Sequence, residues 1–203
     1  MGDLEAAEDS FERSLEAAPG YENGFFRLGV VRERRGDPAG AERAFADGLR
    51  RNPRSSPLAY RLAIVRSSLG RPSAEADWRR AVENSRGAAA IRFGYADWLR
   101  SKGRTSEAAR EAREVLRRRP GEVAALRLLA DSSRRQGRRF AEGLAVEQIV
   151  RATRSLEDYA RLVAIAGEDP AYAKRFRDLS DRLNPRRRAL PELRGGDAAG
   201  ARR

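Results

Sequence analysis

Cysteine and histidine are both absent from this sequence of 203 residues. Without cysteine the chain can form no disulfide and no thiolate metal site, and without histidine it lacks the commonest metal ligand and the commonest general base. Catalytic signatures are missing as well: there is no Gly-x-Ser-x-Gly motif, no P-loop, no Gly-x-Gly-x-x-Gly with an acidic partner and no cluster of metal ligands. We therefore predict that the protein is not an enzyme and uses no cofactor, metal or small-molecule substrate.

The sequence also has no run of about 18 apolar residues, the length that a membrane-spanning helix needs. Its first residues, MGDLEAAEDSFE, are acidic where a secretion signal is basic and then apolar. These absences predict no membrane span and a cytoplasmic location. A chain whose signal has been removed, or a fragment of an exported protein, would show the same pattern.

Lysine is scarce, because only Lys102 and Lys174 accompany the 40 arginines among the 42 basic residues, and the net charge is +12. The charge is uneven: residues 1–20 carry six carboxylates and one arginine, so the rest of the chain is near +17. An arginine skew with abundant alanine and glycine is typical of a GC-rich genome, and this interpretation is favoured. A surface selected for polyanions would show the same skew, so that alternative stays open.

Several kinds of residue recur with a period of about 34 residues. A glycine followed by Asp or Arg occurs five times, at spacings of 34, 34, 33 and 34 residues: Gly2, Gly36, Gly70, Gly103 and Gly137. An alanine follows most of these glycines, and four residues later comes an aromatic residue or a second alanine: Ala7 and Phe11, Ala41 and Phe45, Ala74 and Trp78, Ala108 and Ala112. A second series precedes the glycines: Leu28-Gly29, Leu62-Ala63, Tyr95-Ala96 and Leu129-Ala130. Prolines close the units: Pro19, Pro53, Pro120 and Pro185.

This periodicity predicts a series of hairpins, each made of two amphipathic helices joined by a glycine turn. Small residues are expected where the paired helices cross, because a bulky side chain there would hold the backbones apart. The larger residue one turn beyond the alanine lies on the same helical face and fills the space between neighbouring hairpins. A proline after the second helix ends it without removing an interior hydrogen bond.

These residues resemble the tetratricopeptide repeat (TPR), as found in bacterial-type scaffold proteins. The best match is VVRERRGDPAGAERAFADGLRRNP, residues 30–53, and the resemblance covers residues 2–153 well and 155–184 loosely. The chain departs from the family where Arg32, Arg66 and Ser133 replace the usual aromatic near the end of the first helix. The resemblance implies an all-α, right-handed superhelical solenoid of helical hairpins, with about five units and roughly 11 helices.

The predicted solenoid spans residues 1–184, and its first unit lacks its first helix. It comprises a half repeat, four full repeats and a degenerate capping pair in which Gly167 takes the turn position only 30 residues after Gly137: 1–20, 21–53, 54–86, 87–120, 121–153 and 155–184. The predicted helices are 3–17, 22–35, 38–51, 56–69, 73–85, 89–101, 105–118, 122–135, 139–153, 156–166 and 170–183. Residues 185–203 are expected to be a disordered tail with a net charge of +4, either an unselected terminus or an arm for acidic lipid or nucleic acid.

The half repeat leaves an apolar stripe, which includes Leu4 and Phe11, without its usual partner helix. We expect this stripe to be an exposed interface, since exposed apolar patches mark contacts. Three explanations remain: the chain is a fragment of a longer repeat array, its start lies upstream, or another protein covers the stripe.

The resemblance implies that the first helices line a concave groove. Its predicted lining changes along the chain from apolar and aromatic residues to charged ones: Phe26, Val30, Tyr60, Ile64, Phe93, Asp97, Arg127, Asp131 and Arg134. For Phe26, Tyr60 and Phe93 a place in the core is an equal alternative. The Lys/Asn/Arg clamp by which chaperone adaptors hold a terminal carboxylate is absent, because Phe26, Val30 and Tyr60 stand in its place.

The sequence thus predicts a non-catalytic protein–protein interaction scaffold that binds a peptide or helix of a partner protein in its groove. One alternative is a regulatory or oligomerisation segment of a larger multidomain protein. Another is a polyanion (nucleic acid) binder acting through clusters of arginine at 117–119, 134–139 and 186–188. Carboxylates such as Glu42 and Glu111 lie on helices beside arginines and are expected to be solvated surface charges rather than acid–base groups.

Overall fold

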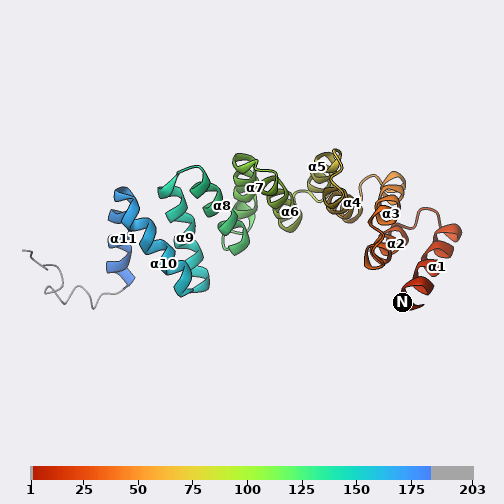
Figure 1. The fold of residues 1–203 in the computed structure, drawn as a ribbon, viewed down its shortest axis with the longest axis horizontal. Coiled ribbons are helices and arrows are strands. Elements are labelled where there is room, and N and C mark those ends of the chain that lie inside the picture. Colours follow the sequence, from red (N-terminus) through yellow and green to blue (C-terminus); the bar gives the residue numbers. More distant parts are fainter. Residues whose placement is uncertain (1, 184–203) are drawn as a thin grey trace, which may run out of the picture. The chain divides into compact units, whose positions relative to one another are not determined.

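A computed structural model of the protein describes residues 2–183, which form helices and the connections between them (Figure 1). Eleven helices lie in this range: α1 (Gly2–Ala17), α2 (Glu22–Arg34), α3 (Pro38–Arg51), α4 (Ser56–Ser68), α5 (Ala74–Asn84), α6 (Ala89–Ser101), α7 (Thr105–Arg118), α8 (Val123–Arg135), α9 (Arg139–Thr153), α10 (Leu156–Glu168) and α11 (Pro170–Leu183). The all-α class and the helix order predicted from the sequence are confirmed. Helix ends agree within one residue, except that α10 ends two residues later than expected.

Glycine in the left-handed region makes the turn inside four hairpins. Gly36, Gly70, Gly103 and Gly137 have φ between 66° and 78°, which only glycine adopts without strain. The prediction of a turn at Gly167 is wrong, because this residue lies inside α10. The chain turns instead at Asp169, whose carboxylate accepts hydrogen bonds from the backbone N–H groups of Ala171 and Tyr172 and so caps α11.

The chain divides into two compact units, Met1–Ala125 (unit 1) and Leu126–Arg203 (unit 2). In unit 1, α2 pairs with α3, α4 with α5 and α6 with α7, while α1 packs against α2 and α3 against α4. In unit 2, α10 packs against α9, and α11 contacts both. The predicted tail, residues 185–203, and Pro185 lie outside the described residues.

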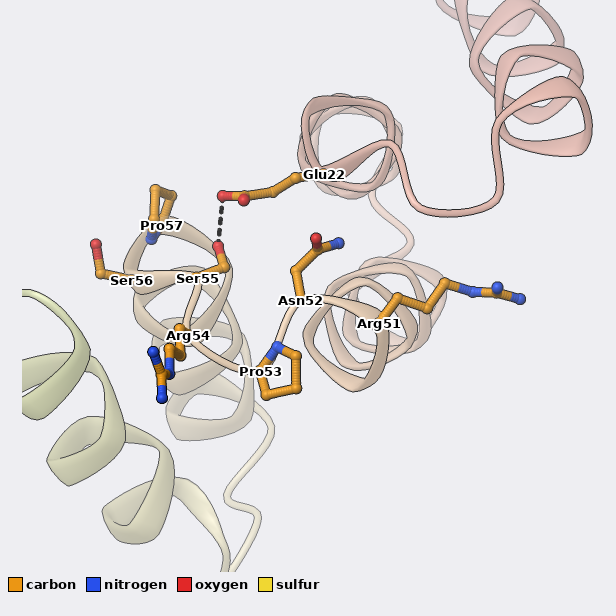
Figure 2. A pocket seen from close by; sticks show the side chains of 8 residues that line it. All are labelled: Glu22, Arg51, Asn52, Pro53, Arg54, Ser55, Ser56 and Pro57. Carbon is orange, nitrogen blue, oxygen red and sulfur yellow. Dashed lines mark hydrogen bonds between the residues drawn. The ribbon is translucent and has the colours of Figure 1, made fainter.

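The connections between hairpins of unit 1 are built differently from one another. Between α3 and α4 the chain reads Asn52-Pro53-Arg54-Ser55, and the Ser55 hydroxyl accepts the N–H of Leu58 to cap α4. The same hydroxyl donates to the Glu22 carboxylate at 2.6 Å, which ties this connection to the start of α2 (Figure 2). Between α5 and α6 the proline is missing, and Arg86 and Gly87 both adopt positive φ, 53° and 73°.

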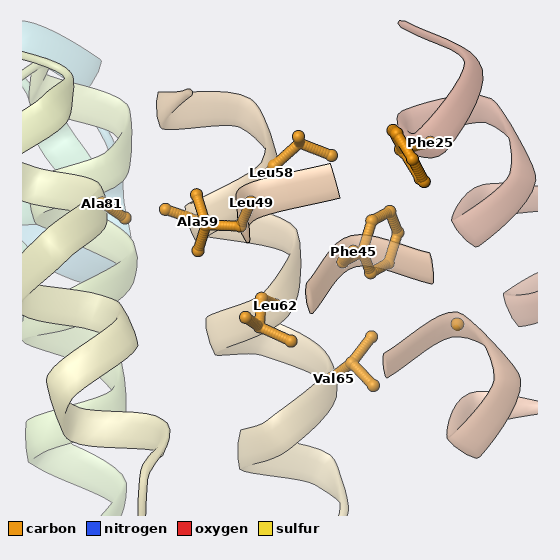
Figure 3. Packing of buried hydrophobic residues seen from close by; sticks show 9 residues of the cluster. Phe25, Phe45, Leu49, Leu58, Ala59, Leu62, Val65 and Ala81 are labelled. Carbon is orange, nitrogen blue, oxygen red and sulfur yellow. The ribbon is translucent and has the colours of Figure 1, made fainter. Parts of the chain in front are cut away.

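Close approach of the helices explains the small residues of the repeat. At Gly29, an added Cβ would lie 2.3 Å from the Phe45 ring, so glycine lets α2 sit directly on this aromatic side chain. Phe45 is fully buried, and burying such a side chain contributes about 2–3 kcal/mol. The surrounding core draws on α2, α3, α4 and α5 (Figure 3): Phe25, Ala41, Phe45, Leu49, Leu58, Ala59, Leu62, Val65 and Ala81.

Trp78 occupies the corresponding position in the next repeat. Its ring meets Tyr60 edge-on at 5.6 Å between centroids and stacks against Tyr95 at 6.4 Å. An added Cβ at Gly94 would lie 2.9 Å from the indole and 3.3 Å from the Tyr60 ring. The bulk of the tryptophan therefore requires glycine in the interior of α6. The Trp78 ring, through its contacts with α4 and α6, links the repeats 54–86 and 87–120.

Unit 2 has a core of its own around Tyr172 of α11. Its members are Ala130, Ala145, Val146, Leu162, Ile165 and Tyr172. An added Cβ at Gly143 would lie 2.5 Å from the Tyr172 ring, so α9 and α11 repeat the glycine-on-aromatic contact of unit 1. The fully buried Tyr172 explains why the loosely matching last pair still packs against the preceding helix.

Candidate functional site

The candidate groove residues of unit 1 come from α2, α4 and α6. We call them the first-helix face: Phe26, Val30, Tyr60, Ile64, Phe93 and Asp97. All six are half-buried, so each keeps part of its surface open to solvent. The first helices lie next to one another, because α2 contacts α4 directly and the Tyr60 ring of α4 approaches Gly94 of α6.

Phe26 shows how these side chains share the core and the surface. The Phe26 ring lies 6.3 Å from the ring of the buried Phe45. The guanidinium of Arg61, on α4, lies 5.7 Å from the centroid of the Phe26 ring. Arg61 also comes within 3.6 Å of the Glu33 carboxylate of α2. Burial raises the pKa of Glu33 above its ordinary value, although the charge of Arg61 opposes this shift. The apolar part of the face is thus bordered by a partly desolvated charged pair.

Tyr60 and Val30 pack against the same core cluster from its exposed side. Of the two alternatives that the sequence left for Tyr60, core or groove, the contact with the core is present, and the groove stays a prediction. Phe93 is half-buried on α6, and Asp97 of the same helix binds Arg100 at 2.7 Å. The only charged residue of the first-helix face, Asp97, is therefore paired on its own helix, and the rest of the face is uncharged.

The remaining candidates lie in unit 2, where two of them form ion pairs. Arg127 binds Asp158 at 3.3 Å, and Asp131 binds Arg161 at 3.0 Å. Arg134 is exposed and forms no ion pair among the described residues. The first-helix face belongs to unit 1 and these three residues to unit 2, so the graded groove stays a prediction.

Leu4 and Phe11 of α1, predicted to be an exposed interface, are half-buried. The same helix places the Leu15 side chain within 2.8 Å of where a Cβ on Gly24 would stand, so α1 sits closely on the start of α2. This contact covers one side of the stripe, while Leu4 and Phe11 keep part of their surface open to solvent, and the role of the stripe as an interface stays a prediction.

Arginines that bridge successive hairpins are the feature that sequence reasoning missed. Arg32 of α2 donates to Glu8 of α1 at 2.8 Å. Arg66 of α4 reaches Glu42 of α3 and the buried Asp77 of α5, both at 2.9 Å. These are the positions where the repeat family has an aromatic residue, so an ion pair replaces an apolar contact between hairpins.

Further along unit 1, one more pair joins successive hairpins and another joins the two helices of a single hairpin. Arg104 binds Glu75 of α5 at 2.5 Å, and Arg92 of α6 binds Glu111 of α7 at 2.5 Å. Glu111 is buried and Glu42 is half-buried, so the prediction that these carboxylates are solvated surface charges is wrong. The signal in the sequence was the spacing of 24 residues that separates both Glu8 from Arg32 and Glu42 from Arg66.

Arginines hold three of these carboxylates, Glu8, Glu42 and Glu75, in their charged form. Hydrogen bonds from Arg32 keep the pKa of Glu8 below its ordinary value, and those from Arg104 do the same for Glu75. For Glu42 burial raises the pKa, but the hydrogen bonds of Arg66 and Arg71 outweigh it and leave the pKa lowered. Carboxylates fixed in this way are poor proton acceptors, so they bind arginine rather than act as general bases.

Over residues 2–183, no group of three or more acidic side chains is arranged to hold a metal ion. Within the same residues, no helix combines the length and the apolar character that crossing a membrane requires.

Comparison with solved structures identifies the fold. YrrB, described as a TPR protein with an unusual peptide-binding site, is 20% identical and has a TM-score of 0.65, over 79% of this chain and 83% of its own. MamA is 19% identical with a TM-score of 0.65, over 79% of this chain and 92% of its own. PilF of Pseudomonas aeruginosa is 19% identical with a TM-score of 0.60, over 78% of this chain and 74% of its own. The chain therefore has the TPR fold. No protein-family model and no curated protein matches the sequence.

Proposed function

We propose that the chain is a non-catalytic scaffold that binds an apolar helix or extended peptide of a partner protein on the first-helix face of unit 1. The observation that carries this proposal is the row of half-buried apolar side chains on adjacent first helices, Phe26 and Val30 on α2 with Tyr60 and Ile64 on α4. Each keeps exposed apolar surface, and a partner that covered all four would remove that surface from water.

The face also supplies features that would orient a partner. Arg61 and Glu33 stand at its border, so a charged residue of the bound segment would meet a partly desolvated pair rather than open solvent. Such border charges select the register of a bound peptide more than they add affinity. YrrB, which shares the fold, is described as having a peptide-binding site, and this supports a peptide as the class of ligand.

The absence of catalysis and a cytoplasmic location are part of the same proposal. In the described residues arginines hold carboxylates of neighbouring helices, as at Glu42 and Glu75. An acid–base pair would need one carboxyl group with a raised pKa beside a charged one, and the arginines here lower both.

The test begins with peptides selected from a random phage-displayed library against the wild-type chain and then made synthetically. Val30→Gln with Ile64→Gln removes apolar contact from the face while sparing the rings that pack on Phe45 and Trp78. We expect affinity for the selected peptides, measured by fluorescence anisotropy, to fall at least about tenfold because two buried aliphatic contacts are lost. Helix content and hydrodynamic size should stay unchanged.

The matched control is Leu156→Gln with Val163→Gln, which changes two exposed aliphatic side chains of α10 in unit 2. This control should bind the peptides as the wild type does. If it loses binding while the variant of the first-helix face keeps it, the peptides bind elsewhere and the proposed site is wrong. Phe26→Ala is a poor probe on its own, since it also weakens the contact with Phe45.

A further inference from the structure

The two edges of unit 1 differ in charge. In each hairpin the glycine turn lies at one edge, and the connection to the next hairpin lies at the other. The turn edge comprises residues 2–9, 28–45, 62–79 and 94–112, and the loop edge comprises 10–27, 46–61, 80–93 and 113–125. The turn edge has 11 basic residues and 12 carboxylates, which give a net charge of −1. The loop edge has 13 basic residues and 7 carboxylates, which give a net charge of +6.

Hydrogen bonds between successive connections show that the loop edge is continuous. Asn52 donates to the Gly20 carbonyl at 3.3 Å, and Asn84 donates to the Pro53 carbonyl at 3.1 Å. At the next junction an added Cβ on Gly87 would lie 3.2 Å from the Arg118 guanidinium, so the end of α7 borders the α5–α6 connection. Arginines from three repeats therefore stand along one edge rather than at scattered places.

Most arginines of the loop edge have no carboxylate partner. Among the described residues, eight of its 13 basic residues form no ion pair, and all eight are exposed: Arg13, Arg27, Arg51, Arg54, Arg80, Arg86, Arg113 and Arg118. At the turn edge only three of the 11 basic residues form no ion pair among the described residues: Arg34, Arg43 and Lys102. Pairing inside the fold accounts for the arginines of the turn edge but not for those of the loop edge.

We propose that the loop edge of unit 1 is a second docking surface, distinct from the first-helix face, and that it takes an acidic segment of a partner protein. A planar guanidinium binds a carboxylate through two parallel hydrogen bonds, so each exposed arginine offers a ready position for an Asp or Glu side chain. Between α3 and α4 a hollow of about 580 Å³ is bordered by Arg51 and Arg54, which point to opposite sides of it (Figure 2).

Charge spacing favours an acidic polypeptide over nucleic acid. Carboxylates lie between the arginines of this edge, at Asp47, Glu83 and Glu114. Arg50 and Arg117 already bind Asp47 and Glu114, whereas Glu83 forms no ion pair among the described residues. A duplex carries one negative charge for about every 1.7 Å of its axis, so it would be repelled at Glu83. A polypeptide can put acidic residues against the arginines and neutral ones against the carboxylates. Stacking of single-stranded bases would find one exposed ring on the described part of this edge, Tyr21, because Tyr60 and Phe93 are half-buried.

A membrane surface is disfavoured by the lack of apolar side chains that could enter it. Of the large hydrophobic residues that are exposed in the described part of the chain, only Tyr21 belongs to the loop edge. Arginines alone would hold an anionic bilayer weakly, since stable attachment needs apolar insertion as well as charge.

The test measures binding of four fluorescent probes to the full chain: poly-L-glutamate, a single-stranded and a double-stranded oligonucleotide of the same charge, and phosphatidylglycerol vesicles. The loop-edge variant carries Arg54→Gln, Arg86→Gln and Arg118→Gln. Its matched control carries Arg34→Gln, Arg43→Gln and Lys102→Gln, which remove the same three charges from exposed, unpaired residues of the turn edge. Circular dichroism confirms that both variants remain folded.

We expect poly-L-glutamate to bind the wild type at low salt and to be released as salt is added. The loop-edge variant should bind it roughly tenfold more weakly, with a shallower dependence on salt, because three surface charge pairs are lost. The control should stay within about twofold of the wild type.

Three outcomes would overturn the proposal. An equal loss in the two variants would show that net charge, not this edge, attracts the probe. Tighter binding of either oligonucleotide or of the vesicles than of poly-L-glutamate would assign the edge to nucleic acid or lipid. No binding of poly-L-glutamate at low salt would mean that the edge takes no acidic segment. The Val30→Gln, Ile64→Gln variant should bind poly-L-glutamate as the wild type does. The proposal for the loop edge is therefore tested independently of the proposal for the first-helix face.

Discussion

The turn edge and the loop edge of unit 1 are made of the same helices and nearly the same number of basic residues, yet they use them differently. At the turn edge arginines reach carboxylates of the neighbouring hairpin, as Arg66 of α4 reaches Glu42 of α3 while also binding Asp77 of its own hairpin. At the loop edge the hairpins are joined mainly by backbone carbonyls, with Asn52 and Asn84 as donors. Arginine at the turn edge therefore helps fix how the repeats stack, whereas most arginines of the loop edge have no carboxylate partner among the described residues.

Removal of an arginine should destabilise the protein much more at the turn edge than at the loop edge, and this is the largest effect that we expect. Arg66→Ala leaves the buried Asp77 and the half-buried Glu42 without their shared donor, so we expect the free energy of unfolding to fall by about 2–4 kcal/mol. Arg54→Ala at the loop edge should change it by no more than about 0.5 kcal/mol. Urea unfolding followed by circular dichroism measures both. Equal losses would remove the distinction between the edges.

Acid should weaken the turn edge selectively. The pKa values of Glu8, Glu42 and Glu75 are lowered in the folded chain, so their stabilisation is complete above the ordinary value of 4.5 and is lost as the pH falls through the lowered values. Thermal melting between neutral pH and pH ~3 should show this decline. A variant with Glu8→Gln, Glu42→Gln and Glu75→Gln should melt lower at neutral pH and lose less on acidification.

The control for the acid experiment replaces two exposed carboxylates of the loop edge, Glu16→Gln and Glu83→Gln. Neither forms an ion pair among the described residues, so the control should keep the wild-type dependence on pH. A flattened dependence in this variant, with no change in the triple variant, would contradict the assignment of acid sensitivity to the turn edge.

Glycine substitutions compare the backbone of the two edges. Gly36 and Gly87 have similar positive φ, 78° and 73°, so alanine should cost about 1–2 kcal/mol at either position. An added Cβ at Gly36 meets open space, whereas at Gly87 it lies 2.9 Å from the Arg92 guanidinium. Gly87→Ala should therefore be the more destabilising of the two in urea unfolding. A greater loss at Gly36 would show that the Arg92 side chain moves aside freely.

Exchange of arginine for lysine should give the smallest effect. Arg66→Lys keeps the charge but cannot reach Glu42 and Asp77 through two separate nitrogens, and we expect a loss of about 0.5–1 kcal/mol. Arg54→Lys should have no measurable effect on stability. If both exchanges are silent, the turn edge depends on charge alone and not on the fork of the guanidinium.

The hairpins were predictable from sequence because their determinants are local. Gly36 and Gly70 mark turns that need a left-handed residue, and Ala41 and Phe45 mark one face of one helix, so the helix ends follow within two residues. The repeat also predicted that Gly29 would lie where two helices cross. Gly167 misled the prediction because glycine is also tolerated inside a helix, and Asp169 provided the turn instead.

Ion pairing between helices was not predictable in the same way. Glu111 has Arg110 and Arg113 close to it on its own helix, and the sequence does not reveal that Arg92 of the preceding helix binds it at 2.5 Å. The burial of side chains on the first-helix face was not predictable for the same reason. The period placed Phe26 and Tyr60 on the correct helices, but their depth depends on the rings of Phe45 and Trp78 from other helices.

The stacked position of Trp78 gives the protein an optical reporter. The chain has two tryptophans, Trp78 and Trp98, and both belong to unit 1. Trp78 lies in the core between Tyr60 and Tyr95, so its emission should shift to longer wavelength when the repeats 54–86 and 87–120 separate. Unit 2 is silent in tryptophan emission, while circular dichroism records every helix. Agreement or disagreement between the two signals during unfolding will therefore tell whether the two units melt as one cooperative body.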